Sequence, residues 1–199
     1  MLESYNDERL EAAQQNVQVT NRTARFLRAP EGMERVFRNA AISLAKQHLF
    51  ARSLINTGRM AVANTYRGSR VCGDNGGTSV QNVKIQWRPG KTGALNDLLQ
   101  WADGRLLILV FGAQSKASLK RLQELSASGL PVRCVQVLAK GDVAQAREHL
   151  WDKQGHLQSA CAAVPAGGWA VIRPDGYLAD TGKGVNGELI GAVATSLGL

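Results

Sequence analysis

The feature that most limits what this chain can fold into is an unbroken apolar run, Leu106–Phe111, enclosed between Arg105 and Gly112. A strand with one face in water alternates apolar and polar residues, whereas the run LLILVF has no polar residue on either face. It therefore predicts a strand in the middle of a sheet, with other elements packed on both of its faces. A chain of 199 residues with 44% hydrophobic side chains has enough apolar material for such a layered core.

The residues around this run show alternating helix and strand patterns. A short helix is predicted before it, at 94–104. After it we expect a helix at 115–129, a strand at 132–139, a helix at 142–155, a hairpin at 169–180 that turns at Pro174–Gly176, and a last helix at 186–199. The order strand, helix, strand, helix, hairpin, helix resembles a thioredoxin-like fold, with one parallel and one antiparallel strand pair. The predicted fold class is thus α/β with a mixed sheet.

The first third of the chain has helical periodicity instead. Helices are predicted at 2–27 and 33–48, with a short continuation that ends near Gly58. Their apolar stripes are thin, and two such helices cannot enclose a core, so we expect another surface to cover them. The predicted organisation is a helical segment at 1–60, a linker at 61–92 with one short strand at 83–87, and the thioredoxin-like domain at 93–199.

A thioredoxin-like fold raises the question of redox chemistry, which needs a Cys-x-x-Cys pair at the turn after the first central strand. Here Ser115 and Ser118 stand at that spacing, and serines cannot form a disulfide. Working thioredoxins also have a proline before the hairpin strand. Gly168 stands about there, and Pro165 is displaced, so the predicted scaffold is redox-inactive.

The remaining chemical motifs have ordinary structural explanations. Gly182, Gly184 and Gly187 form a G-x-G-x-x-G pattern with too little chain after it for a dinucleotide fold, and PGKTG at 89–93 lacks the first glycine of a phosphate loop. The other residue types considered as ligands, nucleophiles or ring contacts are predicted to be structural: Cys72, Cys134, Cys161, His48, His149, His156, Trp87, Trp101, Trp151 and Trp169. We predict no catalytic, cofactor-binding or metal-binding residue. A weaker alternative is a thiol enzyme that uses Cys134 or Cys161.

The formal charge of +8 comes from 24 Lys and Arg against 16 Asp and Glu. The basic residues do not cluster and have few aromatic neighbours, which favours a solvated surface or an acidic protein partner over nucleic acid. No run of 18 apolar residues exists, and the first residues are polar and acidic. We therefore expect a cytoplasmic protein without membrane contact.

Four short segments together resemble a known family. They are Tyr5–Arg9 (Tyr-x-x-Glu-Arg), Gly58–Arg59, Tyr66–Ser69 (Tyr-x-Gly-Ser) and Arg173–Gly176 (Arg-Pro-Asp-Gly), with a Pro-Gly at 89–90. Their order is similar to the C-terminal portion of the FAD-dependent aromatic-ring hydroxylases, the group of phenol hydroxylase and hydroxyphenylpropionate hydroxylase. That portion ends in a thioredoxin-like domain without redox cysteines.

The resemblance implies a role beside a flavin domain. Family members use FAD and NAD(P)H to hydroxylate aromatic substrates, but the motifs that hold the flavin have no counterpart in this chain. The sequence thus predicts a hydroxylase tail that is not catalytic alone and has no cofactor of its own. Its partner would be the missing flavin domain or a second copy in a homodimer. The alternative is a stand-alone thioredoxin-like module for dimerisation or protein binding.

Overall fold

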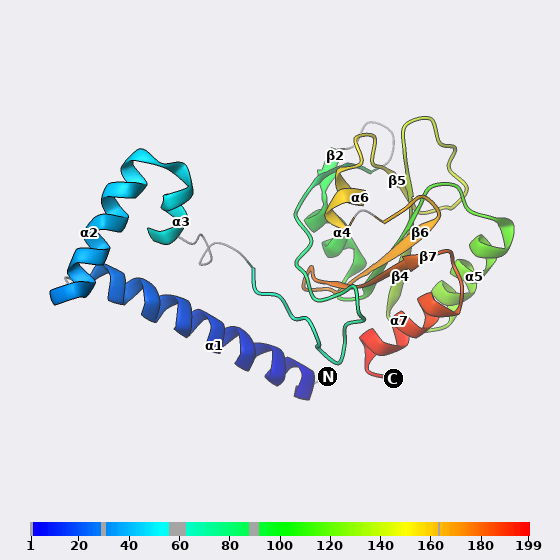
Figure 1. Ribbon diagram of the computed structural model, residues 1–199. Helices are drawn as coiled ribbons and strands as arrows, with labels where there is room; N and C mark the ends of the chain where they lie inside the picture. Colours follow the sequence, from blue (N-terminus) through cyan, green and yellow to red (C-terminus); the bar gives the residue numbers. More distant parts are fainter. Residues whose placement is uncertain (1, 29–30, 56–62, 88–91, 163) are drawn as a thin grey trace. The chain divides into compact units, whose positions relative to one another are not determined.

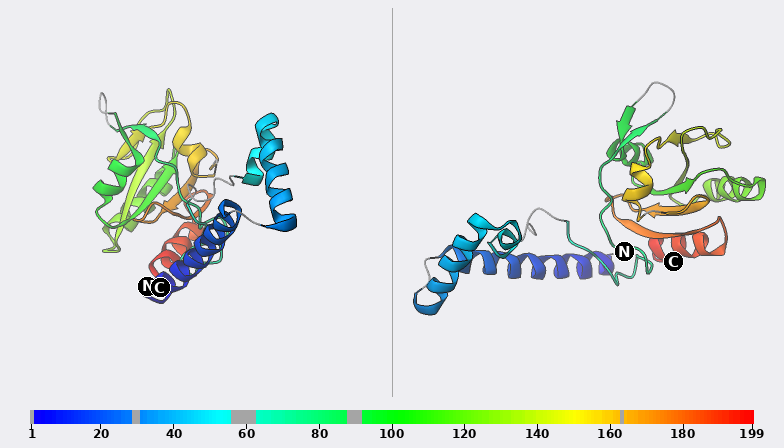
Figure 2. Two further views of the ribbon diagram at one scale, coloured as in Figure 1. Left: turned by 90° about the vertical axis from the view of Figure 1, so that its left-hand side faces the viewer. Right: turned by 45° about the horizontal axis from the view of Figure 1, so that its top comes forward.

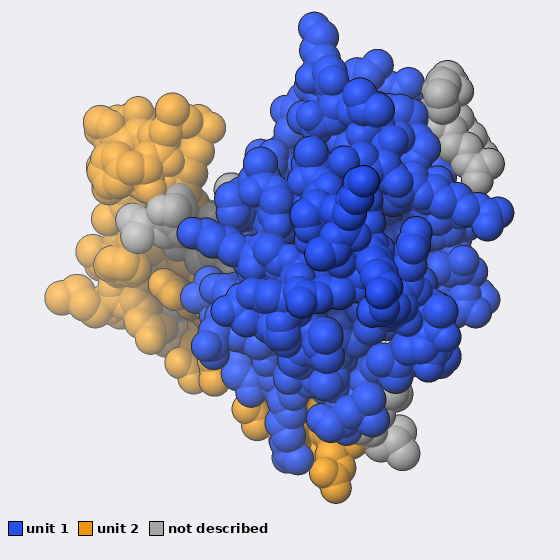
Figure 3. All heavy atoms as spheres, turned by 90° about the vertical axis from the view of Figure 1, so that its right-hand side faces the viewer, with its two compact units in different colours: residues 1, 66–199 blue, residues 2–65 orange. Residues whose placement is uncertain are grey.

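The computed structural model describes residues 2–28, 31–55, 63–87, 92–162 and 164–199. The chain forms two compact units, one of residues 2–65 and one of residues 66–199, shown in different colours in Figure 3. Among the described residues, no helix has both the length and the apolar character that a bilayer crossing requires.

The first unit is helical, as predicted. It consists of α1 (Leu2–Leu27), α2 (Gly32–Gln47), the short 3-10 helix η1 (Leu49–Ala51) and α3 (Arg52–Ile55). The buried apolar side chains described in this unit are all alanines: Ala12, Ala41, Ala45 and Ala51. Its large apolar side chains are mostly exposed, among them Leu10, Val17, Leu27, Met33, Val36, Phe37, Leu49 and Phe50. This unit therefore has little core of its own.

The second unit is built on a seven-stranded mixed sheet with the order β2-β1-β5-β4-β3-β6-β7 (Figure 1). β3 is parallel to β4 and antiparallel to β6, and β6 and β7 form an antiparallel hairpin. The strands are β1 (Lys84–Gln86), β2 (Thr92–Ala94), β3 (Leu106–Phe111), β4 (Val132–Leu138), β5 (His149–Trp151), β6 (Gly168–Ile172) and β7 (Leu178–Lys183). The helices are α4 (Leu95–Ala102), α5 (Lys116–Ala127), α6 (His156–Ala160) and α7 (Gly187–Leu197).

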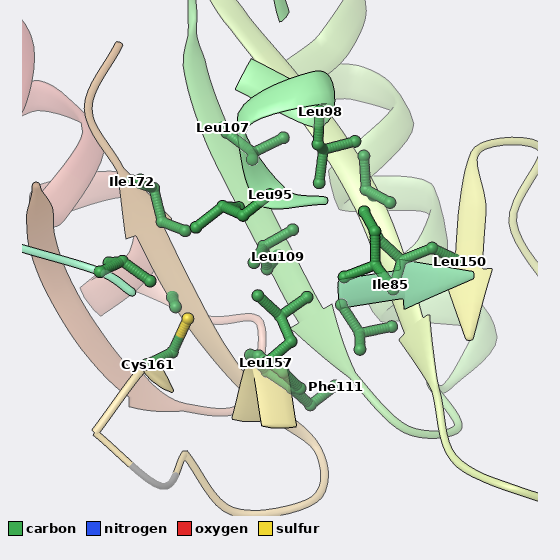
Figure 4. Close-up of a cluster of buried hydrophobic side chains, with 14 of the residues drawn as sticks. Ile85, Leu95, Leu98, Leu107, Leu109, Phe111, Leu150, Leu157, Cys161 and Ile172 are labelled. Carbon is green, nitrogen blue, oxygen red and sulfur yellow. The ribbon is translucent and has the colours of Figure 1, made fainter. Parts of the chain in front are cut away.

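The sheet has an apolar core on each face, with helices on both sides (Figure 2). Leu107, Leu109 and Phe111 of β3 pack on one face with side chains of α4 and α6, as Figure 4 shows. Ile108 and Val110 pack on the other face with side chains of α5 and α7. All six residues of β3 are buried, which confirms the prediction from the apolar run. The fold is α/β and thioredoxin-like.

The helix predicted at 142–155 is wrong. The structure has no helix at residues 142–148; His149–Trp151 form β5, parallel to β4, and a helix begins only at His156. Val143, an apolar residue of this stretch, is 78% exposed. The physical reason is that the Gln136 side chain accepts hydrogen bonds from the backbone N–H groups of Gln145 and Ala146, so tertiary bonding overrides local helix propensity.

Residues 66–87 differ from the linker that the sequence analysis expected. The first part of this segment lies along the β6–β7 hairpin: Gly73 N–H and Gly77 N–H donate to the carbonyls of Ala179 and Leu178, at 2.8 Å in each case. A Cβ on Gly76 would lie 2.0 Å from the carbonyl oxygen of Ala179. The glycines that suggested a connecting loop are therefore needed for a close backbone approach.

Candidate functional site

The turn between β3 and α5 is where a thioredoxin-like fold would carry its dithiol. Ser115 caps α5: its side-chain oxygen accepts a hydrogen bond from the Ser118 N–H at 3.1 Å. The two hydroxyl oxygens lie 3.0 Å apart. The structure thus brings together the two serines singled out in the sequence. The pair serves the helix end and has no group that can be oxidised to a disulfide.

A network of three glutamines holds this turn in place. Gln136, in the centre of β4, is only 2% exposed, and its side-chain N–H groups donate to the Gly112 carbonyl at 3.0 Å and to Gln145 Oε1 at 3.2 Å. Gln114 N–H donates to the same Gln145 oxygen at 2.8 Å, and its own amide donates to the Phe111 carbonyl. Both polar atoms of Gln136 are thereby satisfied, as burial demands.

Sequence reasoning missed this network. The available signal was a lone amide in VRCVQVLA, because a glutamine inside a strand buried on both faces needs partners. Its arrangement closes the loop by backbone and amide contacts and leaves no side chain with nucleophilic or acid–base character among the three. The network stabilises the β3–α5 turn, at the position where a thioredoxin-like redox enzyme has its reactive group.

The loop that precedes β6 approaches this turn through glycine backbone. Gly167 N–H donates to the Phe111 carbonyl at 2.7 Å, and Gly184 N–H donates to the Gly167 carbonyl at 3.0 Å. Gly168, expected about where a thioredoxin has its proline, is the first residue of β6, and a Cβ there would lie 2.8 Å from the Gly182 carbonyl oxygen. Pro165 lines a neighbouring hollow instead.

None of the three cysteines stands in the β3–α5 turn, and all three are free thiols. Burial, together with a smaller effect of the nearby Asp152 carboxylate, raises the pKa of Cys161 to about 12. Burial also raises the pKa of Cys134, against a smaller opposite effect of a hydrogen bond with Ser126. Both thiols are therefore protonated at neutral pH, which disfavours the reading of a thiol enzyme. Cys72 Sγ accepts a bond from Arg173 Nη1 at 3.6 Å.

The Arg-Pro-Asp-Gly motif at 173–176 forms the β6–β7 turn. Arg173 Nη2 is 2.7 Å from Asp175 Oδ2, and Gly176 N–H donates to the Arg173 carbonyl at 3.0 Å. Gly176 has φ +82°, which favours glycine. Its carbonyl accepts the Val80 N–H at 2.9 Å. The motif is thus a structural clamp that ties the preceding segment to the hairpin.

The other motifs also have structural surroundings in the described residues. Gly182 lies in β7 and Gly187 begins α7, while the PGKTG stretch falls mostly outside the described residues. Trp87 and Trp101 make an edge-to-face contact with their ring centres 4.9 Å apart, and the rings of His149 and Trp151 make another with their centres 4.7 Å apart. No group of three metal-ligating side chains gathers anywhere in the ranges that the structure describes.

The described residues of the sheet unit line several surface hollows. One of about 600 Å³ lies between residues 79–82, α4 and the β6–β7 turn. A second of about 590 Å³ includes Asp180, Pro165 and Trp169. The third, of about 480 Å³, lies beside the first half of β4 and includes Arg105 and Arg133.

Comparison with known proteins identifies the fold but no family. No protein-family model and no curated protein match the chain. Among solved structures, the flavin-dependent monooxygenase PieE, in complex with FAD and substrate, has a TM-score of 0.56 and 16% identity and matches 84% of this chain and 30% of its own. Aklavinone-11 hydroxylase matches 62% of this chain and 21% of its own, with a TM-score of 0.46 and 22% identity.

A thioredoxin-like protein from Porphyromonas gingivalis has a TM-score of 0.48 and 22% identity, over 68% of this chain and 95% of its own. The chain thus spans less than a third of PieE and of aklavinone-11 hydroxylase but nearly the whole of the small thioredoxin-like protein. At these identities the comparisons describe fold alone.

Proposed function

We propose that this chain is the C-terminal module of an FAD-dependent aromatic-ring hydroxylase, in which it supports the flavin domain and contributes to oligomer contacts. The observation that carries the proposal is the extent of the PieE match. Its 84% coverage is more than residues 66–199 could supply by themselves, so it extends into the helical unit. A likeness that includes both units fits the family's helices followed by a redox-inactive thioredoxin-like domain.

The chemistry of the β3–α5 turn supports a role without catalysis by this chain. Ser115 and Ser118 bond to each other and cap a helix, and the buried glutamines around them are mutually satisfied. In the proposed assembly, FAD and NAD(P)H belong to the flavin domain and supply the oxidation there. The residues of this chain would hold the domain and exclude water from its surface.

The apolar face of α2 supports a covered surface. Met33, Val36 and Phe37 are 83%, 62% and 68% exposed and recur at the three- and four-residue spacing of one helix face. Contiguous exposed apolar side chains of this size mark interaction sites. In the main proposal the flavin domain covers them.

The second candidate function is a stand-alone dimerisation or protein-binding module. The same exposed face of α2 favours it, because a second copy could cover it by pairing helices around a two-fold axis. In that case the native protein would be this chain alone.

The decisive experiment is to identify the native species. An antibody raised against the recombinant chain, used for immunoblotting and affinity capture from the source cells, would detect a polypeptide well above 21.4 kDa, or a tightly bound flavoprotein, if the main proposal holds. A species of 21.4 kDa without any captured flavoprotein overturns it. Light scattering of that species then tests the second candidate, which requires a dilution-resistant dimer.

Activity assays of the recombinant chain complete the test. We expect no FAD binding by fluorescence quenching, no phenol-dependent NAD(P)H oxidation in the presence of FAD, and no reduction of insulin disulfides. Stoichiometric FAD binding or turnover by the chain alone would contradict the assignment of the chemistry to another domain.

A further inference from the structure

The first half of β4 is an open sheet edge. β5 pairs with β4 only over Gln136–Leu138, whereas β3 pairs with it from Val132 onward. Among the described residues, no strand lies beside Val132–Val135 on the side away from β3. Such an edge presents backbone groups that can pair with another chain.

The hydrogen-bond register tells which groups face outward. Gly112 N–H donates to the Val137 carbonyl on the β3 side, and Gln136 N–H donates to the Glu148 carbonyl on the opposite side. Because backbone groups alternate between the two edges along a strand, the N–H and C=O of Cys134 point to the same side as those of Gln136. The open edge thus offers one donor and one acceptor at Cys134.

The 480 Å³ hollow lies along this edge. Trp101 of α4, Cys134 of β4 and Glu148 before β5 line it, together with two arginines, Arg105 and Arg133. The hollow therefore combines open backbone with two positive side chains and one negative one.

The Arg133 side chain packs on an aromatic ring and has a buried N–H group without an acceptor among the described residues. Its Cζ lies 4.7 Å from the centre of the Trp101 ring, which orients the guanidinium plane. Its Nε is buried without an acceptor. Among the described residues, neither Arg133 nor Arg105 has an ion pair with a carboxylate. A buried donor without a partner is unfavourable, and a carboxylate is the group that a guanidinium fork binds best.

We propose that the open edge of β4 binds an extended peptide segment that carries one Glu or Asp. The main chain of the peptide pairs with the backbone of Cys134, and its carboxylate binds Arg133 and Arg105 in the hollow. Glu148 disfavours a second acidic residue at the end nearest β5. A second copy fits less well, because symmetric pairing of two such edges would bring the arginines of both copies together. The proposal goes beyond the proposed function and does not depend on it.

The test uses the full chain and a fluorescein-labelled probe peptide, Thr-Val-Glu-Val-Thr, in an anisotropy titration. We expect saturable binding that weakens at least tenfold when glutamine replaces the glutamate. Methylation of the peptide nitrogens tests the backbone contact. Alternate N–H groups of a bound strand face β4 and the others face solvent, so N-methyl groups on one alternating set of residues should abolish binding, and those on the other set should not. Equal binding of the Glu and Gln probes, no effect of either methylation set, or no binding overturns the proposal.

Protein variants locate the site. Arg133→Gln and Arg105→Gln should each weaken binding of the Glu probe about tenfold or more and leave the Gln probe unchanged, whereas Arg147→Gln, an exposed arginine outside the hollow, should change neither. Circular dichroism checks that the variants fold, and Arg105→Gln keeps the test valid if Arg133→Gln does not. Displacement of the probe by dimerisation of the chain, seen by light scattering, would assign the edge to a second copy and reject the peptide.

Discussion

Replacing Gly76 by alanine tests whether residues 66–80 belong to the sheet unit. The added Cβ would lie 2.0 Å from the carbonyl oxygen and 2.7 Å from the carbonyl carbon of Ala179, which is backbone of β7 and cannot rotate away. Either the hairpin and the segment separate locally, or the segment leaves the hairpin. Gly191→Ala in α7 is the matched control, because nothing lies within 4 Å of a Cβ at that position.

The cost can be bounded from the structure. Overpacking of this kind destabilises by about 1–3 kcal/mol. Four backbone hydrogen bonds join the segment to the hairpin, through the N–H groups of Gly73, Gly77, Val80 and Leu178. At a net contribution of about 1 kcal/mol each, loss of these bonds alone would cost about 4 kcal/mol, and detachment would also expose the buried Val80, so local separation is the less costly response. We expect a loss of about 3 kcal/mol, or a decrease in Tm of about 9 °C.

The assay is urea unfolding followed by tryptophan fluorescence. All four tryptophans lie in residues 66–199, so the signal reports on the sheet unit and not on the helical unit. Gly191→Ala should keep or raise stability by up to about 1 kcal/mol. If Gly76→Ala unfolds within about 0.5 kcal/mol of the unaltered chain, the close approach of the two backbones is refuted.

Three further perturbations have defined outcomes. Leu98→Ala, at a fully buried position of α4, should lower the unfolding free energy by about 2–5 kcal/mol in the same assay, and a loss below 1 kcal/mol would contradict the packing. Folding raises the pKa of Cys161 from 9.0 to about 12, so the folded state holds this proton more tightly than the unfolded state does. The free energy of unfolding should therefore fall as pH rises between these values, and Cys161→Ala should make that fall less steep. A variant whose unfolding free energy falls as steeply as that of the unaltered chain would contradict the raised pKa. Ser115→Ala removes the cap of α5 and should cost about 0.5–2 kcal/mol, measured by thermal denaturation; an unchanged Tm would contradict the cap.

The core of the fold could be predicted from sequence because its signals are local. Leu106–Phe111 has no polar residue, and the Leu119, Leu122 and Leu125 spacing that predicted α5 requires only helix geometry. The turn at Pro174–Gly176 follows from the residue types alone. In each of these elements, the hydrophobic periodicity and the residues at the ends are those typical of the structure that forms.

What failed depended on partners in other elements of the fold. The stretch 142–148 has helix-forming residues, but the side chain of Gln136, in the preceding strand β4, accepts hydrogen bonds from the N–H groups of Gln145 and Ala146. The glycines of residues 73–77 look like a linker until β7 is placed against them. The Arg133 hollow was invisible for the same reason, because Trp101, Arg105 and Arg133 come from different elements.

That the buried apolar side chains described in the helical unit are all alanines has a consequence for the living cell. An alanine contributes little when it is buried, since it has a single methyl group to remove from water. Quality-control proteases degrade proteins that open often, so under the proposed function the amount of this polypeptide should follow the supply of the partner that covers Met33 and Phe37. The cellular amount of this polypeptide would then report how much of it is assembled with that partner.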